Sequence, residues 1–294
     1  MPLAATRSGL TLAYDTTGSP DDPPLLLVSG LGTQLLSWDD GLCALLADAG
    51  RYVVRFDNRD AGLSTSFDSH PVDLAAVFGA MADGDDTAAR ALVPYTLSDM
   101  ARDAVELLDA LGVGPAHVVG ASMGGMIAQT MAIEHPDRVL TLTSIMSTTG
   151  EPAYGRSTRE ARQVLLSPAP TEREAYIEDS VRSLVWHSKR YADADKVRDL
   201  AARSFDRSFR PAGTARQLAA VTADGSRADG LRSLAVPTLV IHGLDDTLIA
   251  PAGGERTAEL VPGAELLLVP DMGHDRPEPL WPLLVEAVVT HTAG

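Results

Sequence analysis

The fold is decided by nine residues, His117-Val118-Val119-Gly120-Ala121-Ser122-Met123-Gly124-Gly125. They predict a short apolar strand that runs into the pattern G-x-S-x-G and continues as a helix from Met123. This layout is typical of a nucleophile elbow, in which a serine lies at the tip of a sharp strand-to-helix turn and points its hydroxyl into a cleft. Strand and helix approach each other closely there, so a side chain on Gly120 or Gly124 would clash.

Strand and helix signals alternate on both sides of this turn. The pattern G-x-S-x-G fixes three residues and occurs by chance in roughly one chain in ten of this length. It is therefore the strand before it and the helix after it that support a nucleophile elbow. The stretch 25–28 is apolar at every position, as in a strand buried on both faces of a parallel sheet. The alternation predicts an α/β fold with a mostly parallel, doubly wound sheet. Besides the strand before Ser122, strands are expected at 11–16, 25–29, 52–56, 139–145, 237–242 and 265–269.

Helices are expected between these strands, and several have recognisable starts. Ser37 and Ser98 are candidate N-cap residues, and Thr171 with Glu174 has the spacing of a capping box. The stretch 66–96 is less regular, and we expect a surface excursion with one short helix.

Strand signals disappear in one long part of the chain, residues 148–234. Prolines punctuate this part, and its apolar residues recur at helical spacing. We therefore expect a helical cap domain at 148–234, inserted after the strand at 139–145 into a core domain that consists of 1–147 and 235–294.

The composition narrows the function classes. Of 294 residues, 45% are apolar and 22% are charged, which is ordinary for a globular protein. The net charge of −16 argues against nucleic acid and anionic membranes as partners, because phosphate groups are bound by clustered Lys and Arg. Neither a secretory signal nor a membrane-spanning apolar run is visible, so we expect a cytoplasmic protein. The lone Cys43 excludes an internal disulfide and a Cys-based metal site.

A nucleophilic serine needs a base, and His274 is the best placed of the seven histidines. It lies in a loop directly after the strand at 265–269. Because parallel strands end at the same edge of a sheet, His274 and Ser122 should emerge on one rim. The remaining histidines are expected to be surface, packing or turn residues, namely His70, His117, His135, His187, His242 and His291.

An acid should hold the histidine in the correct tautomer. Asp245 and Asp246 follow the strand at 237–242 on the same rim, and either could serve. The chain order Ser, Asp, His resembles that of the α/β-hydrolase family, serine esterase type. The resemblance covers nearly the whole chain apart from 66–96 and the cap.

The resemblance implies the role of further residues. The family's strand end His-Gly-x-x-Asp matches His242 to Asp246, which favours Asp246 over Asp245 as the triad acid. The two backbone donors of an oxyanion hole should be Met123 and Leu31. Ser29 stands where the family commonly has histidine, a departure that leaves the backbone donor in place.

Within the family, the stretches 57–65, 116–120 and 236–241 are most similar to a methylesterase that hydrolyses a methyl ester on a polyketide. The resemblance therefore implies a carboxylic-ester hydrolase that forms an acyl-enzyme on a small-molecule ester, without metal or organic cofactor. The turn at 57–65 should be a structural, ion-paired support of the rim. Candidate substrate-binding residues are Trp38, Met126, Tyr154 and Trp186.

Two alternatives remain open at this point. The same triad could act on a lactone, an amide, a carbon–carbon bond or a peracid, whereas Ser122 argues against epoxide hydrolases and haloalkane dehalogenases, which have aspartate there. The second alternative is a non-catalytic receptor for a small apolar ligand.

Overall fold

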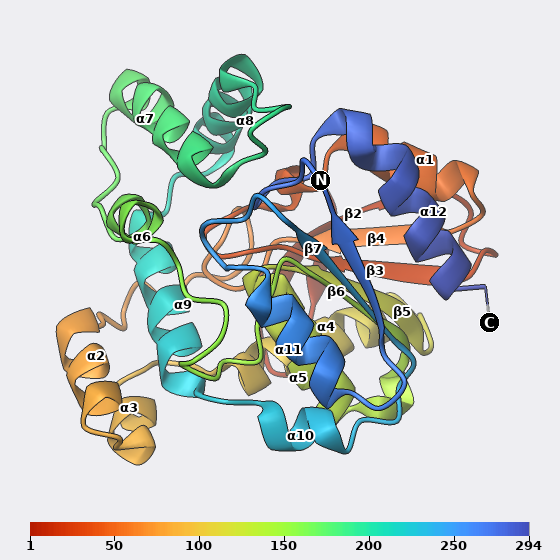
Figure 1. The fold of residues 1–294 in the computed structure, drawn as a ribbon, viewed down its shortest axis with the longest axis horizontal. Coiled ribbons are helices and arrows are strands. Elements are labelled where there is room, and N and C mark those ends of the chain that lie inside the picture. Colours follow the sequence, from red (N-terminus) through yellow and green to blue (C-terminus); the bar gives the residue numbers. More distant parts are fainter. Residues whose placement is uncertain (294) are drawn as a thin grey trace.

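One eight-stranded sheet organises the computed structural model, which describes residues 1–293 (Figure 1). The strand order is β1-β2-β4-β3-β5-β6-β7-β8. The pairs β1–β2 and β2–β4 are antiparallel, and all other neighbouring pairs are parallel. The strands are β1 (Leu3–Ala5), β2 (Thr11–Thr17), β3 (Pro24–Val28), β4 (Tyr52–Phe56), β5 (Ala116–Ala121), β6 (Val139–Ile145), β7 (Thr238–Gly243) and β8 (Glu265–Val269). All the predicted strands are present, and only the three-residue edge strand β1 was not expected.

Helices cover both faces of the sheet. One face packs on α1 (Asp40–Asp48) and α12 (Trp281–His291). The other face packs on α4 (Leu97–Ala110), α5 (Met123–Glu134), α10 (Ala228–Arg232) and α11 (Ala252–Leu260). Along β3, fully buried leucines alternate between the two cores, as the period of two in a strand requires. The predicted α/β fold with a doubly wound, mostly parallel sheet is confirmed.

The connection from β6 to β7 is helical and holds α6 (Arg159–Leu165), α7 (Arg173–Ser180), η3 (Val181–Trp186), α8 (Ala194–Arg207), α9 (Pro211–Asp224) and α10. Figure 1 shows α6 to α9 on one side of the sheet, with α7 and α8 outermost. We call α6 to α9 the inserted helices. In contrast, α10 packs on the sheet through the buried Leu231.

The stretch 66–96 forms two helices, α2 (Leu74–Ala82) and α3 (Asp86–Ala91), so the expectation of one is wrong. Two aspartates explain the difference, because Asp73 and Asp85 each accept a backbone amide hydrogen bond that starts a separate helix. Both helices pack their apolar side chains against α9.

The helix after Ser122 starts at Met123 as predicted, but none of the three predicted capping sites caps its helix. Asp39, rather than Ser37, accepts the amide hydrogen bond that starts α1, because Ser37 ends the short helix η1 (Leu35–Ser37). Thr96, rather than Ser98, caps α4 with a complete capping box. The capping box expected at Thr171 does not form, since α7 begins without a side-chain cap. Within residues 1–293, no helix has both the length and the apolar character needed to cross a bilayer.

Candidate active site

Ser122 lies at the sharp turn between β5 and α5. Its backbone has a positive φ of 57° with ψ −122°, a combination that a non-glycine residue rarely adopts. A Cβ on Gly120 would lie 2.1 Å from the Gly124 carbonyl oxygen, and a Cβ on Gly124 would lie 2.1 Å from the Val28 carbonyl oxygen. The close approach expected of the two glycines is confirmed.

A chain of hydrogen bonds joins Ser122, His274 and Asp246. Ser122 Oγ lies 2.9 Å from His274 Nε2, and His274 Nδ1 lies 2.6 Å from Asp246 Oδ2. In the tautomer that fits both contacts, the serine hydroxyl donates to Nε2 and Nδ1–H donates to the carboxylate. The three residues follow β5, β7 and β8, whose carboxyl ends share one edge of the sheet.

Asp246 is held as a buried carboxylate. Its Oδ1 accepts hydrogen bonds of 2.9 Å from the amides of Leu248 and Ile249. Burial by itself would raise the pKa of Asp246, but the charge of His274 and hydrogen bonds from His242 and His274 outweigh it and lower the pKa to about 2. The group therefore stays ionised at neutral pH.

Asp245, the alternative acid, points elsewhere. Its carboxylate accepts from the amide of Lys189 at 3.2 Å and lies 3.2 Å from Lys189 Nζ. Of the two neighbouring aspartates, the structure thus brings Asp246 to His274.

Two backbone amides near Ser122 have no acceptor within the part of the chain that the structure describes. Neither the Met123 nor the Leu31 amide donates to any group in residues 1–293. A Cβ on Gly30 would lie 3.8 Å from Ser122 Oγ, so the backbone that leads to Leu31 passes next to the serine. Free amide donors next to a nucleophile suit a developing oxyanion.

The turn at 57–65 carries the ion pairs that the sequence predicts. Arg59 binds Asp103 through two contacts of 2.6 and 2.7 Å, and both side chains are buried. Asp60 accepts from Arg216 of α9 at 2.7 and 2.8 Å, and Asp57 accepts from Arg207 of α8 at 2.7 Å. The turn therefore connects the sheet to the inserted helices.

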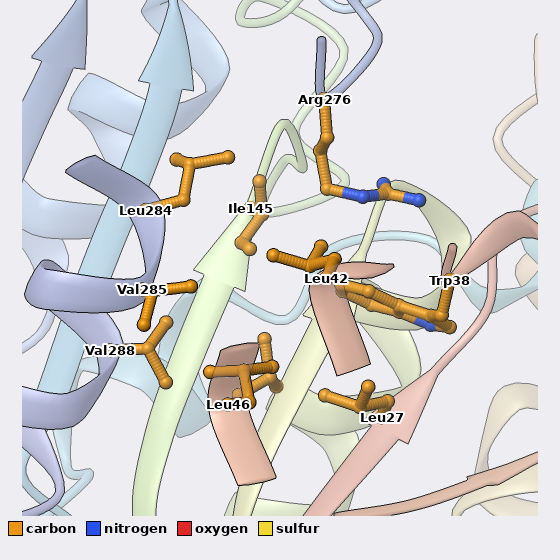
Figure 2. A pocket seen from close by; sticks show the side chains of 10 residues that line it. Leu27, Trp38, Leu42, Leu46, Ile145, Arg276, Leu284, Val285 and Val288 are labelled. Carbon is orange, nitrogen blue, oxygen red and sulfur yellow. The ribbon is translucent and has the colours of Figure 1, made fainter. Parts of the chain in front are cut away.

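Trp38 is not a residue of the pocket above Ser122, and that prediction is wrong. It is 1% exposed and lies in the core between the sheet and α1. Figure 2 shows it beside Leu27 and Leu42 at a small cavity of about 10 Å³, at most the space of one water. The guanidinium of Arg276 lies 4.2 Å from its ring. Trp38 directly follows η1 and shares its core with the apolar side chains of α1, so its ring packs there.

The other three candidate substrate residues have different surroundings. Met126 is buried among the apolar side chains on the α4 and α5 face. Tyr154 is exposed, with its ring 4.8 Å from the guanidinium of Arg256 on α11. The Trp186 carbonyl accepts a hydrogen bond of 2.6 Å from the His274 amide. Their part in substrate binding stays a prediction.

Gln217 of α9 is a buried residue of this region that the sequence analysis missed. Its Oε1 accepts from the Gly32 amide at 2.8 Å, and its Nε2 donates to the Arg59 carbonyl at 2.7 Å. A signal was present, because Arg216 and Gln217 are polar residues at positions that share a helix face with the buried Gly213 and Ala220.

A family model described as alpha/beta hydrolase fold matches residues 23–276. The chain belongs to the α/β-hydrolase family. Two rhodomycin D methylesterases, from Streptomyces sp. (strain C5) and Streptomyces peucetius, are each 29% identical to this α/β-hydrolase over 98% of its length and 96% of their own. The crystal structure of a hydrolase from Pseudomonas aeruginosa PA01 matches with a TM-score of 0.73 at 26% identity, covering 100% of this chain and 98% of that one.

These comparisons confirm the family resemblance that the sequence indicates. The methylesterase that the stretches 57–65, 116–120 and 236–241 resemble most is aclacinomycin methylesterase. This likeness agrees with the presence of methylesterases among the relatives.

Proposed function

We propose that this α/β-hydrolase is a carboxylic-ester hydrolase in which Ser122 is the nucleophile, His274 the general base and acid, and Asp246 the orienting carboxylate. The observation that carries the proposal is the hydrogen-bonded chain from Ser122 Oγ through His274 to Asp246. The ionised Asp246 stabilises the imidazolium that forms when His274 takes the serine proton.

The reaction has two halves. In the first, Ser122 Oγ attacks the ester carbonyl carbon while its proton passes to His274 Nε2. The bond to the alcohol oxygen then breaks, the alcohol leaves with that proton, and an acyl-enzyme remains. In the second half, His274 takes a proton from water, the hydroxide attacks the acyl carbon, and the proton returns to Ser122 as the acid is released.

The amides of Met123 and Leu31 donate to the oxyanion of both tetrahedral intermediates in this proposal. Each such donor contributes about 2.7–4 kcal/mol to transition-state stabilisation. Both belong to the backbone, so the replacement of the family's usual histidine by Ser29 does not remove a donor.

The proposed substrate is a methyl or other small-alkyl ester of a bulky apolar acid. The methylesterase relatives support this class. In this proposal, residues 148–234 supply the cap domain over the core domain of 1–147 and 235–294 through α6 to α9, whereas α10 packs with the core. The cap selects the acyl group.

The test is the Ser122→Ala variant, assayed with 4-nitrophenyl acetate and with methyl esters of increasing acid size. We expect turnover to fall by about 10⁴- to 10⁶-fold with unchanged folding. Ser98→Ala, which removes a surface hydroxyl on α4, is the control and should keep full activity.

Retained turnover in Ser122→Ala would remove Ser122 from the mechanism. Parallel panels of amides and lactones decide between ester hydrolysis and other uses of the triad. Labelling of Ser122 by a fluorophosphonate without turnover of any ester would instead indicate a non-catalytic receptor.

A further inference from the structure

The loop that carries Leu31 is held by side chains of the inserted helix α9. Residues 30–33 form a turn in which the Thr33 amide donates to the Gly30 carbonyl at 3.3 Å. Gly32 takes a positive φ of 66°, as the third position of a type II turn requires. The Gly32 amide belongs to the central peptide of this turn, so the acceptor of that amide fixes the position of the residue that directly follows Leu31.

That acceptor is Gln217 of α9. Gln217 is 0% exposed and bridges two loops, since Oε1 accepts from the Gly32 amide at 2.8 Å and Nε2 donates to the Arg59 carbonyl at 2.7 Å. With both hydrogen bonds formed in the interior, the side chain has one orientation. Thr214, one turn earlier on α9, fills the space where a Cβ of Gly32 would lie.

The helix that holds Gln217 is itself firmly placed. Arg216 forms two contacts of 2.7 and 2.8 Å with the fully buried Asp60. A Cβ on Gly213 would lie 2.1 Å from the Asp60 carbonyl oxygen, so α9 approaches the turn at 57–65 as closely as backbones permit. The position of Gln217 relative to the loop at 30–33 therefore follows from the docking of α9.

We infer that Gln217 is a positioning residue for ester hydrolysis, one that holds the Gly30–Thr33 turn so that the Leu31 amide points at the oxyanion. The inference rests on the proposed function, because it assigns a role to the Leu31 amide. Under this inference, one of the two oxyanion donors is held in place by the inserted helix α9. Stabilisation of the oxyanion therefore depends on the docking of α9 as well as on the triad.

The experiment compares Gln217→Met with Gln129→Met in the full-length protein. Gln129 of α5 is a matched control, being another 0% exposed glutamine with two side-chain partners, Ser144 Oγ and Arg227 Nε, both at 3.1 Å. Phenylboronic acid is the probe, because it adds reversibly to Ser122 Oγ and becomes tetrahedral and anionic, as the intermediate does. Its dissociation constant is measured with kcat, KM and Tm.

For Gln217→Met we expect the boronate dissociation constant to rise and kcat to fall together by about 10- to 100-fold, less than complete removal of a donor. In the control Gln129→Met, both KM and the dissociation constant of the boronate should stay within about threefold of the wild-type values. A lowered Tm in both variants, with boronate affinity no weaker in Gln217→Met than in Gln129→Met, would overturn the inference.

Gln217→Glu keeps an acceptor for Gly32 and loses the donor to Arg59, and it serves also if Gln217→Met does not fold. It should bind the boronate more tightly than Gln217→Met does, because the Gly32 contact is kept. An equal loss of boronate affinity in both variants would contradict the role of the Gly32 contact.

Activity retained by Ser122→Ala would refute the proposed function, whereas an inactive Ser122→Ala with an unaffected Gln217→Met would refute this inference alone.

Discussion

Ser122 is held in a costly backbone conformation that the surrounding residues enforce. A positive φ of 57° on a non-glycine residue costs on the order of 1–3 kcal/mol. Gly120 and Gly124 permit it, because only residues without a Cβ allow β5, β3 and α5 to meet there. The strain aims the hydroxyl at His274 rather than into the core.

At the same scale, Asp246 predicts a pH dependence of stability. Its pKa is lowered from 3.8 to about 2 in the folded protein, so its ionisation stabilises the fold above pH 4 and this contribution is lost as the pH falls towards 2. The total is about 2 kcal/mol, and about half should disappear between pH 5 and pH 3. The check is urea unfolding of wild type and Asp246→Asn at these two pH values.

The wild type should lose more of its free energy of unfolding over this interval than the Asn variant, which has no carboxylate to protonate at this position. Parallel losses in the two proteins would contradict the lowered pKa. Since Asn cannot fix the required tautomer of His274, ester turnover of the variant should fall by about 10⁴-fold.

At the scale of the elements, one substitution in α9 separates helix propensity from packing. The two effects change the free energy of unfolding in opposite directions. Gly213→Ala should stabilise α9 by up to about 1 kcal/mol by helix propensity alone. Its new Cβ would meet the Asp60 carbonyl oxygen at 2.1 Å, so we expect a net loss of about 1–3 kcal/mol instead. Thermal or urea unfolding measures the sign directly.

The matched control is Gly79→Ala in α2. An added Cβ there has no neighbour within 4 Å, so propensity acts alone and the variant should gain about 0.5–1 kcal/mol. A stabilised Gly213→Ala would mean that α9 does not pack as closely on the turn as the structure shows.

The arrangement of the elements explains which residues of the site could be predicted from the sequence and which could not. Ser122 and His274 could be predicted because each follows a strand, and parallel strands end at one edge. The choice of Asp246 over Asp245 needed the resemblance to the family's strand end His-Gly-x-x-Asp. Trp38 was misplaced because a position near the elbow does not tell whether a side chain faces the pocket or the core. Gln217 was missed because its partner Gly32 lies far away in sequence, and only the docking of α9 brings the two together.

For the whole molecule, the pair Arg216–Asp60 joins the inserted helices to the sheet. Both side chains are buried, so Arg216→Met should leave an uncompensated carboxylate and cost about 3–5 kcal/mol in the free energy of unfolding. The exposed pair Arg203–Asp199 provides the control, and Arg203→Met should change stability by no more than about 0.5 kcal/mol.

The double variant Asp60→Asn/Arg216→Met tests the cause. Removing the unpaired carboxylate should restore part of the lost stability, because the charge and not the missing contact causes most of the loss. A double variant that is less stable than Arg216→Met would show that the loss has another origin.

The inserted helices contact the site at both of its flanks. A Cβ on Gly273 would lie 2.4 Å from the Trp186 carbonyl oxygen, and Gly32 and Gln34 donate to α9 and to the end of α8. For protein engineering, the segment that can be exchanged between relatives is consequently larger than the inserted helices alone. A chimaera that takes α6 to α9 from a relative has to bring the loops at 30–34, 57–65 and 273–275 with them, or foreign side chains will face buried charges and unmatched amides.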